Sequence, residues 1–183
     1  MTTEREPLRV VLIGPECTGK TWLAADLAGH YTVPWSTEFA RTFVDVHPRP
    51  VEFEDVDAIG RGQVLSEDRA IDRARQRGSA MIIHDTDLVS TWVYSRHYYG
   101  DCPGWIAAAA AQRLADLYLL HDIDAPWIGD GFQRIQPERR GDLYELFAST
   151  LRELGAHVER VAGDWAARRA RAVAAIDDRL RSR

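Results

Sequence analysis

The stretch Leu8-Arg9-Val10-Val11-Leu12-Ile13-Gly14-Pro15-Glu16-Cys17-Thr18-Gly19-Lys20-Thr21 decides the fold of this chain. Residues 8–13 form a short, nearly continuous apolar run rich in β-branched side chains, which is typical of a strand buried on both faces of a parallel sheet. Beyond the two glycines, residues 20–30 carry apolar side chains at helical spacing. The stretch therefore predicts a buried strand, a glycine-containing loop and a helix, in that order.

The loop has the spacing G-x-x-x-x-G-K-T, which is that of a P-loop. Gly14 and Gly19 let backbone N–H groups turn inward around phosphates, and the following helix offers its positive N-terminus to the same charge. Lys20 is expected to reach the β- and γ-phosphates, and the Thr21 hydroxyl to complete a Mg²⁺ shell. The residues predicted to hold a nucleoside triphosphate are Gly14, Pro15, Glu16, Cys17, Thr18, Gly19, Lys20 and Thr21.

Lysine usage supports this motif independently of its spacing. Of 23 basic residues, 22 are arginines, and the single lysine is Lys20. A slim ammonium fits between phosphate oxygens better than a broad planar guanidinium does. By counting, a lone lysine would fall there by chance roughly once in 23 such sequences.

Composition limits the class of protein. A chain of 183 residues fits one domain, so we expect a single domain over residues 1–183. The net charge of −5 argues against a general nucleic-acid binder, and no apolar run approaches the roughly 20 residues that span a membrane. Residues 1–7 have no signal-peptide pattern, and the two cysteines, Cys17 and Cys102, indicate reduced thiols. We therefore expect a cytoplasmic protein whose partners are small molecules, without nucleic acid or membrane; its oligomeric state is left open.

Strand and helix patterns alternate along the whole chain. After the first strand, further strands are expected at 31–35, 79–84, 117–120 and 158–161, with helices at 38–46, 52–76, 88–99, 105–115, 143–154 and 165–180. This alternation predicts an α/β fold with a parallel sheet that is covered on both faces through right-handed crossovers. Ligands of such sheets collect at the carboxyl ends of the strands, where the loops at Gly14, Ser36, Asp85 and Asp122 should meet.

Two aspartates follow the third predicted strand. Asp85 stands where P-loop folds place an acidic group near Mg²⁺, and Asp87 is the competing candidate. The alternative is that one of the two carboxylates caps the next helix by accepting its free N–H groups. We assign Asp85 to the metal or substrate and Asp87 to the cap, and keep Asp87 as a candidate substrate contact.

Glu38 and Arg41 follow the second strand. A carboxylate at this edge can orient an acceptor hydroxyl and take its proton, and Arg41 can steady an anionic group or hold Glu38. The alternative is an ordinary i,i+3 ion pair on a solvated helix face. Spacing alone does not decide between them.

The segment 123–141 reads as an arginine-bearing loop, or lid, because regular patterns resume on both sides. Arginines delivered by a closing loop can stabilise phosphoryl transfer and exclude water. The residues of interest are Trp127, Asp130, Arg134, Arg139 and Arg140. An exposed charged loop without such a role is the alternative.

Four segments of the chain, in this order, resemble a known family. They are GPECTGKTWLAADLA (14–28), VPWSTEFAR (33–41), IIHDTDLVSTWVYSRHYYG (82–100) and DLYLLHDIDAPWIGDGFQR (116–134), and the resemblance, to NadR-type nicotinamide riboside kinase domains, runs over residues 8–154. It implies a three-layer P-loop kinase fold, for which we expect a five-stranded parallel sheet in the order 2-3-1-4-5 and an arginine-bearing lid. It also implies transfer of the ATP γ-phosphate to the 5′-hydroxyl of nicotinamide riboside, giving nicotinamide mononucleotide.

The resemblance also distributes roles among residues of this chain. It implies ATP–Mg²⁺ at Gly19, Lys20 and Thr21, a riboside pocket at Glu38, Asp85, Trp127 and Asp130, and Arg134 as the lid arginine. Together with the residue chemistry, the catalytic candidates are Lys20, Glu38, Asp85 and Arg134, with Glu38 or Asp85 as the general base. Arg41 and Asp87 are further substrate contacts, and Thr21 and Asp85 the metal ligands. Two alternatives stay open: a kinase for another nucleoside or nucleotide, and a regulatory P-loop ATPase.

Overall fold

The computed structural model describes residues 6–125 and 139–183. The strands are β1 (Leu8–Ile13), β2 (Trp35–Ser36), β3 (Met81–Asp85), β4 (Leu117–His121) and β5 (Val158–Val161). The helices are α1 (Lys20–Tyr31), α2 (Phe39–Val46), the 3₁₀ turn η1 (Phe53–Asp55), α3 (Val56–Gln76), α4 (Leu88–Tyr99), α5 (Gly104–Gln112), α6 (Arg140–Glu153) and α7 (Trp165–Arg181).

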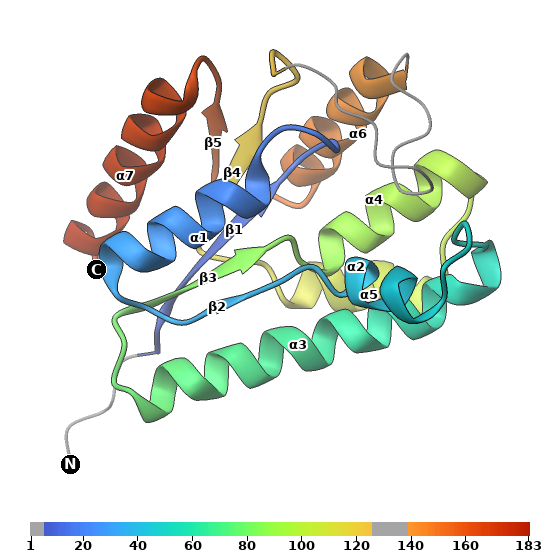
Figure 1. Ribbon diagram of the computed structural model, residues 1–183, viewed down its shortest axis with the longest axis horizontal. Helices are drawn as coiled ribbons and strands as arrows, with labels where there is room; N and C mark the ends of the chain where they lie inside the picture. The colour runs from blue at the N-terminus through green and yellow to red at the C-terminus, as the bar shows by residue number, and fades with distance from the viewer. Residues whose placement is uncertain (1–5, 126–138) are drawn as a thin grey trace.

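All strand pairs are parallel, and the sheet order is β2-β3-β1-β4-β5, so the predicted topology is confirmed (Figure 1). In the central strand, Val10 is in register with Ile83 of β3 on one side and with Leu117 of β4 on the other. The carboxyl ends of β1, β3 and β4 therefore lie at one edge, and that edge carries the predicted phosphate loop.

The second strand differs from its prediction. Residues 31–35 were expected to be extended, but α1 continues through Tyr31 and the strand covers only Trp35–Ser36. Thr32 then ends the helix in the left-handed region (φ 55°), with its N–H bonded to the last helix carbonyls. The Tyr31 hydroxyl donates to Asp177 of α7 at 2.8 Å, so the last residue of α1 is also bonded to a second helix.

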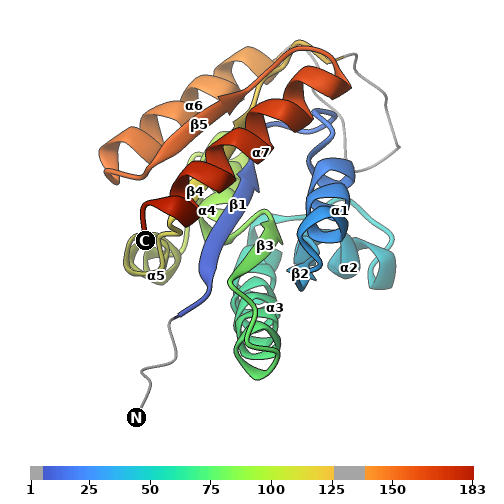
Figure 2. The same ribbon diagram turned by 90° about the vertical axis from the view of Figure 1, so that its left-hand side faces the viewer.

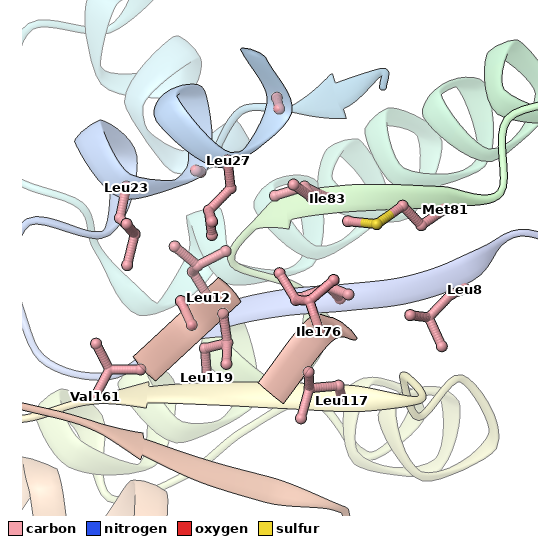
Figure 3. Close-up of a cluster of buried hydrophobic side chains, with 14 residues drawn as sticks. Leu8, Leu12, Leu23, Leu27, Met81, Ile83, Leu117, Leu119, Val161 and Ile176 are labelled. Carbon is pink, nitrogen blue, oxygen red and sulfur yellow. The ribbon is translucent and has the colours of Figure 1, made fainter. Parts of the chain in front are cut away.

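The core is divided between the two faces of the sheet. In β1, Val10 and Leu12 point to the layer formed by α1 and α7, whereas Val11 and Ile13 point to the layer formed by α4, α5 and α6. Figure 3 shows the first of these clusters, with Leu23 and Leu27 of α1 above the strands. Helix α3 lies beneath β3 in both overall views (Figures 1 and 2). Within the described residues, no helix is long and apolar enough to cross a membrane.

Candidate active site

The phosphate loop takes the backbone form that its glycines predict. Gly14 and Gly19 have φ of 129° and 82°, values that side chains disfavour. A Cβ on Gly14 would stand 2.8 Å from the His121 carbonyl oxygen, so only glycine lets β1 and β4 approach this closely here. Cys17, at φ 55°, also adopts a left-handed conformation within the loop. The loop is therefore a strained backbone turn against the end of the sheet.

An arginine of α7 supports this loop from behind. The Arg168 side chain is only 5% exposed, and its guanidinium donates to the carbonyl oxygens of Thr18 (3.2 Å) and Gly163 (2.8 Å) and pairs with Asp124. The ring nitrogen Nδ1 of His121 lies 2.9 Å from the same Thr18 oxygen. No local pattern in the sequence marks Arg168 as a functional residue, because nothing near position 168 shows that it lies beside position 18.

Lys20 is buried at the first turn of α1. Its Nζ donates to the Pro15 carbonyl at 2.7 Å. Burial lowers the pKa of Lys20 below its usual value, while the carboxylates of Glu38, Asp85 and Glu16 act in the opposite direction. The ammonium thus lies among three carboxylates, and its positive charge is what would attract an incoming phosphate group.

The first of two cavities lies along the phosphate loop and has a volume of about 710 Å³. Its walls come from the loop, from α1 and from the start of α7, and they are Cys17, Thr18, Gly19, Lys20, Thr21, Trp22, Arg41, Asp124, Ala125, Gly163, Asp164, Trp165 and Arg168. Trp22 and Trp165 are 79% and 44% exposed, which is unusual for tryptophan. We call this the phosphate-loop cavity.

The second cavity, of about 350 Å³, lies between α2, α3 and α4. We call it the aromatic cavity, because tyrosines of α4 line it together with polar side chains. Its walls are Glu16, Lys20, Glu38, Ala40, Arg41, Val44, Pro50, Val51, Val56, Ile59, Gln63, Thr86, Ser90, Thr91, Tyr94, Ser95, Tyr98 and Tyr99. Lys20 and Arg41 line both cavities, so the two spaces meet at the end of the phosphate loop.

The tyrosines of the aromatic cavity form an ordered wall. The rings of Tyr94 and Tyr98 are nearly parallel, with an interplanar angle of 5° and centroids 6.1 Å apart. Their hydroxyls donate to the phosphate loop: Tyr98 to Glu16 at 2.7 Å and Tyr94 to the Gly14 carbonyl at 3.3 Å. Their i,i+4 spacing was visible in the sequence, yet it did not show that both side chains line a cavity, or that the Tyr94 ring also packs against Phe147 of the core.

Asp85 is completely buried beside the phosphate loop and lines neither cavity. Neither carboxylate oxygen has a hydrogen-bond partner of normal geometry among the described residues, although the Thr21 hydroxyl lies near enough to favour the charged form. Burial, followed by the Glu38 carboxylate, raises the pKa of Asp85 to about 6. A buried carboxylate with free oxygens next to a hydroxyl fits a hard cation such as Mg²⁺, which needs few protein ligands when phosphate oxygens supply others.

Asp87 caps α4, as the sequence predicted. Its carboxylate accepts from the Val89 N–H at 3.0 Å and from the Tyr118 hydroxyl at 2.7 Å. The side chain is buried and lies in the wall of neither cavity. This placement does not support the interpretation of Asp87 as a substrate contact, because both of its oxygens already hold protein donors.

Glu38 and Arg41 form the expected i,i+3 ion pair, with 3.1 Å between Arg41 Nε and a Glu38 carboxylate oxygen. Both side chains line the aromatic cavity, so the pair faces a cavity rather than open solvent. Glu38 stands at the N-cap of α2 but does not cap the helix with its own side chain. Its carboxylate is therefore available to the cavity.

Part of the predicted lid lies outside the described residues, and with it Trp127, Asp130 and Arg134. At the far end of the segment, Arg140 is the first residue of α6 and donates to the Ala125 carbonyl at 3.1 Å. The two ends of the segment are thus joined beside the phosphate-loop cavity, which Ala125 lines.

A parallel sheet with a strained glycine loop between β1 and α1, a buried lysine in that loop and a carboxylate at the end of β3 define a P-loop protein of the α/β class. A family model described as an AAA domain matches residues 9–168. The chain belongs to this AAA-domain family.

Comparisons with individual proteins confirm the resemblance to NadR that the sequence motifs indicated. The chain is 26% identical over 130 residues to the trifunctional NAD biosynthesis/regulator protein NadR of Salmonella typhimurium (strain LT2), and equally to that of Escherichia coli (strain K12). Each match covers 69% of this chain and 31% of the relative, so the chain matches under a third of these proteins' length.

Solved structures show the same fold. A crystal structure of NadR in complex with NR superimposes with a TM-score of 0.83 at 22% identity, covering 97% of this chain and 52% of that one. NadR in complex with NAD and AMP-PNP gives 0.79 at 21% identity, covering 97% and 50%. Thymidylate kinase from Ehrlichia chaffeensis gives 0.70 at 12% identity, covering 95% and 99%.

Proposed function

We propose that this chain is an ATP-dependent kinase that phosphorylates the 5′-hydroxyl of nicotinamide riboside to give nicotinamide mononucleotide. The observation that carries the proposal is the junction of the two cavities at Lys20 and Arg41. One cavity follows a phosphate loop and the other has an aromatic wall, so a γ-phosphate and an acceptor hydroxyl would meet beside these two cations.

The residues around the junction have different roles in the in-line transfer of the phosphoryl group. Lys20 stabilises the charge on the moving phosphoryl group. Glu38 accepts the proton of the acceptor hydroxyl while the hydroxyl oxygen bonds to the γ-phosphorus and ADP leaves. We assign this base role to Glu38 because it lines the aromatic cavity, whereas Asp85 does not. Thr21 and Asp85 would hold Mg²⁺, which neutralises phosphate charge when bound.

The choice of acceptor rests on two supports. The aromatic cavity is lined by Tyr94 and Tyr98, and aromatic side chains favour packing against a planar ring. The relatives and solved structures named NadR are the second support, one of them a complex with NR.

We also propose that the whole chain is one kinase domain and that it acts in the cytoplasm, where ATP is supplied. Residues 123–141 would form its lid, with Trp127, Asp130 and Arg134 as contacts.

The direct test is incubation of the full chain with ATP, Mg²⁺ and nicotinamide riboside, with nicotinamide mononucleotide and ADP measured by liquid chromatography and mass spectrometry. We expect both products in equal amounts, and none of the mononucleotide without Mg²⁺. A parallel panel of other nucleosides and nucleotides decides the acceptor, since a higher kcat/KM for any of them overturns nicotinamide riboside. ATP hydrolysis that no acceptor accelerates would instead indicate a regulatory ATPase.

A further inference from the structure

Gln63 of α3 is bonded to the residues that directly follow the two candidate carboxylates, Glu38 and Asp85. Its side chain is 2% exposed and lies in the wall of the aromatic cavity. The amide oxygen accepts from the Phe39 N–H at 3.0 Å, and the amide nitrogen lies 3.4 Å from the Thr86 carbonyl and 3.3 Å from a Glu67 carboxylate oxygen. Phe39 directly follows Glu38, and Thr86 directly follows Asp85.

The bond to Phe39 replaces a helix cap. The first N–H groups of a helix have no partner within it, and a side chain at the N-cap commonly supplies one. In α2 the N-cap residue is Glu38, and its side chain makes no capping bond. Gln63 supplies an acceptor from another helix instead, so the Glu38 carboxylate is not needed for its own helix.

The bond to Thr86 acts on the other carboxylate. Thr86 has φ 66°, a left-handed conformation that is costly for a threonine. Its N–H is held by the Leu12 carbonyl, and its own carbonyl faces the Gln63 amide. The turn that sets the position of Asp85 is thus bonded from both sides, once by β1 and once by α3.

The neighbouring residue explains how α2 comes close enough for this contact. A Cβ on Gly62 would stand 2.0 Å from the nearest ring atom of Phe39. Only glycine at position 62 leaves room for that ring, and the same approach brings the Phe39 N–H to Gln63. Gly62 and Gln63 together therefore form the part of α3 against which the start of α2 packs.

We propose that Gln63 is a positioning residue: one side-chain amide, bonded to Phe39 and to Thr86, sets the separation between Glu38 and Asp85. The proposal rests on the proposed kinase function, because it concerns the geometry between the acceptor hydroxyl and the phosphate loop. Misplacement of a reacting group by about 1 Å costs on the order of 100-fold in rate. Losing both bonds should accordingly lower kcat more than it raises the KM of either substrate.

The test compares Gln63→Met, which keeps the length of the side chain but makes none of these bonds, with Gln63→Glu, which keeps an acceptor for Phe39 but loses the amide donor to Thr86 and to Glu67. Gln76→Met is the matched control, since Gln76 lies on the same helix with an exposed side chain. We expect Gln63→Met to lower kcat by on the order of 10- to 100-fold, with KM for acceptor and ATP within about twofold. Gln63→Glu should be intermediate, and the control unchanged.

Hydrogen–deuterium exchange provides a readout that does not need activity. The Phe39 amide should exchange faster in Gln63→Met and stay protected in Gln63→Glu. Unchanged protection in Gln63→Met overturns the proposal, as does a rise in acceptor KM at constant kcat, which would mean direct contact with the substrate. If Gln63→Met does not fold, Gln63→Glu decides: protected Phe39 with wild-type kcat overturns the positioning role. A wild-type chain without kinase activity refutes the proposed function alone, since the exchange experiment still tests the bond between Gln63 and Phe39.

Discussion

At the scale of single residues, Lys20 is the clearest link between composition and chemistry. The other 22 of the 23 lysine and arginine residues are arginines, yet the residue at the junction of the two cavities is lysine. Its ammonium lies at 2.7 Å from a carbonyl of the phosphate loop, inside a buried space. A guanidinium is planar and wider, so it should not fit the same place.

Replacement of Lys20 tests this argument. Lys20→Ala should lower kcat by on the order of 100-fold or more, because a charge that stabilises the transition state is removed. Lys20→Arg keeps the charge and should still lose most of the activity. Steady-state rates for both variants, with circular dichroism to confirm folding, are the measurement. Normal turnover of Lys20→Arg would refute the steric explanation of the lone lysine.

Variants of Asp85 and Glu38 should differ in how their rates depend on the Mg²⁺ concentration. Asp85→Asn removes the buried charge beside Thr21, so the variant should need a much higher Mg²⁺ concentration for half-maximal rate. Glu38→Gln removes the base that lines the aromatic cavity and should lower kcat by about 100- to 10,000-fold at unchanged Mg²⁺ requirement. Titration of the rate with Mg²⁺ for both variants distinguishes these roles, and the reverse pattern would exchange the assignments.

At the scale of elements, the support of the phosphate loop comes from α7. Arg168 is almost fully buried and bonds to the loop at Thr18 and to the segment that follows β5. Removal of one partner from a buried charged network leaves other groups unsatisfied, which is costly. The loop should then lose its fixed shape even though its own residues are unchanged.

Arg168→Met is therefore expected to raise the KM for ATP by on the order of 10-fold. The KM for the acceptor should change little, because Arg168 lines the phosphate-loop cavity but not the aromatic cavity. The control is Arg171→Met on the same helix, where the side chain is 59% exposed and pairs with Glu159. Isothermal titration with a non-hydrolysable ATP analogue measures the effect directly. Equal loss of affinity for ATP and acceptor would point to general unfolding rather than to the loop.

At the scale of the whole molecule, a buried group of charges ties α3 to the sheet and to the segment after α5. Glu67 is completely buried, 3.3 Å from the Arg113 guanidinium and 3.8 Å from that of Arg9 in β1. Burial, and then the nearby Asp87 carboxylate, raise the pKa of Glu67 to about 7, although both arginines act in the opposite direction. The folded state thus binds a proton that the unfolded chain releases near its ordinary pKa of 4.5.

The sign of the pH effect follows from this difference. Between pH 4.5 and 7 the folded state holds more protons at Glu67 than the unfolded state does, so its contribution to stability falls as pH rises. Relative to Glu67→Gln, the wild-type chain should lose on the order of 1–3 kcal/mol of unfolding free energy between pH 5 and pH 8. Denaturant unfolding of both at the two pH values measures this change. The exposed Glu153→Gln should show a constant difference, and a wild type that gains stability relative to Glu67→Gln would contradict the assignment.

Much of the fold was determined by the sequence alone. Apolar runs and helical spacings are local properties, so they located five strands and the helices between them to within a few residues, whereas the order of the strands was expected from the P-loop kinase fold. The glycines, Lys20 and Thr21 identified the phosphate loop because its conformation depends on residues adjacent in the chain. Asp87 was correctly predicted as a helix cap for the same reason.

Only the tertiary structure decided which side chains meet. Arg168 lies 150 positions beyond Thr18, and Gln63 reaches residues 24 positions before and 23 positions after it, so no local pattern could indicate these bonds. The bond from Tyr31 to α7, and the cavity that Tyr94 and Tyr98 line together with residues of α2 and α3, likewise join segments that are distant in the chain. Propensity and periodicity act over a few neighbouring residues, whereas a site is assembled from segments that only folding brings together.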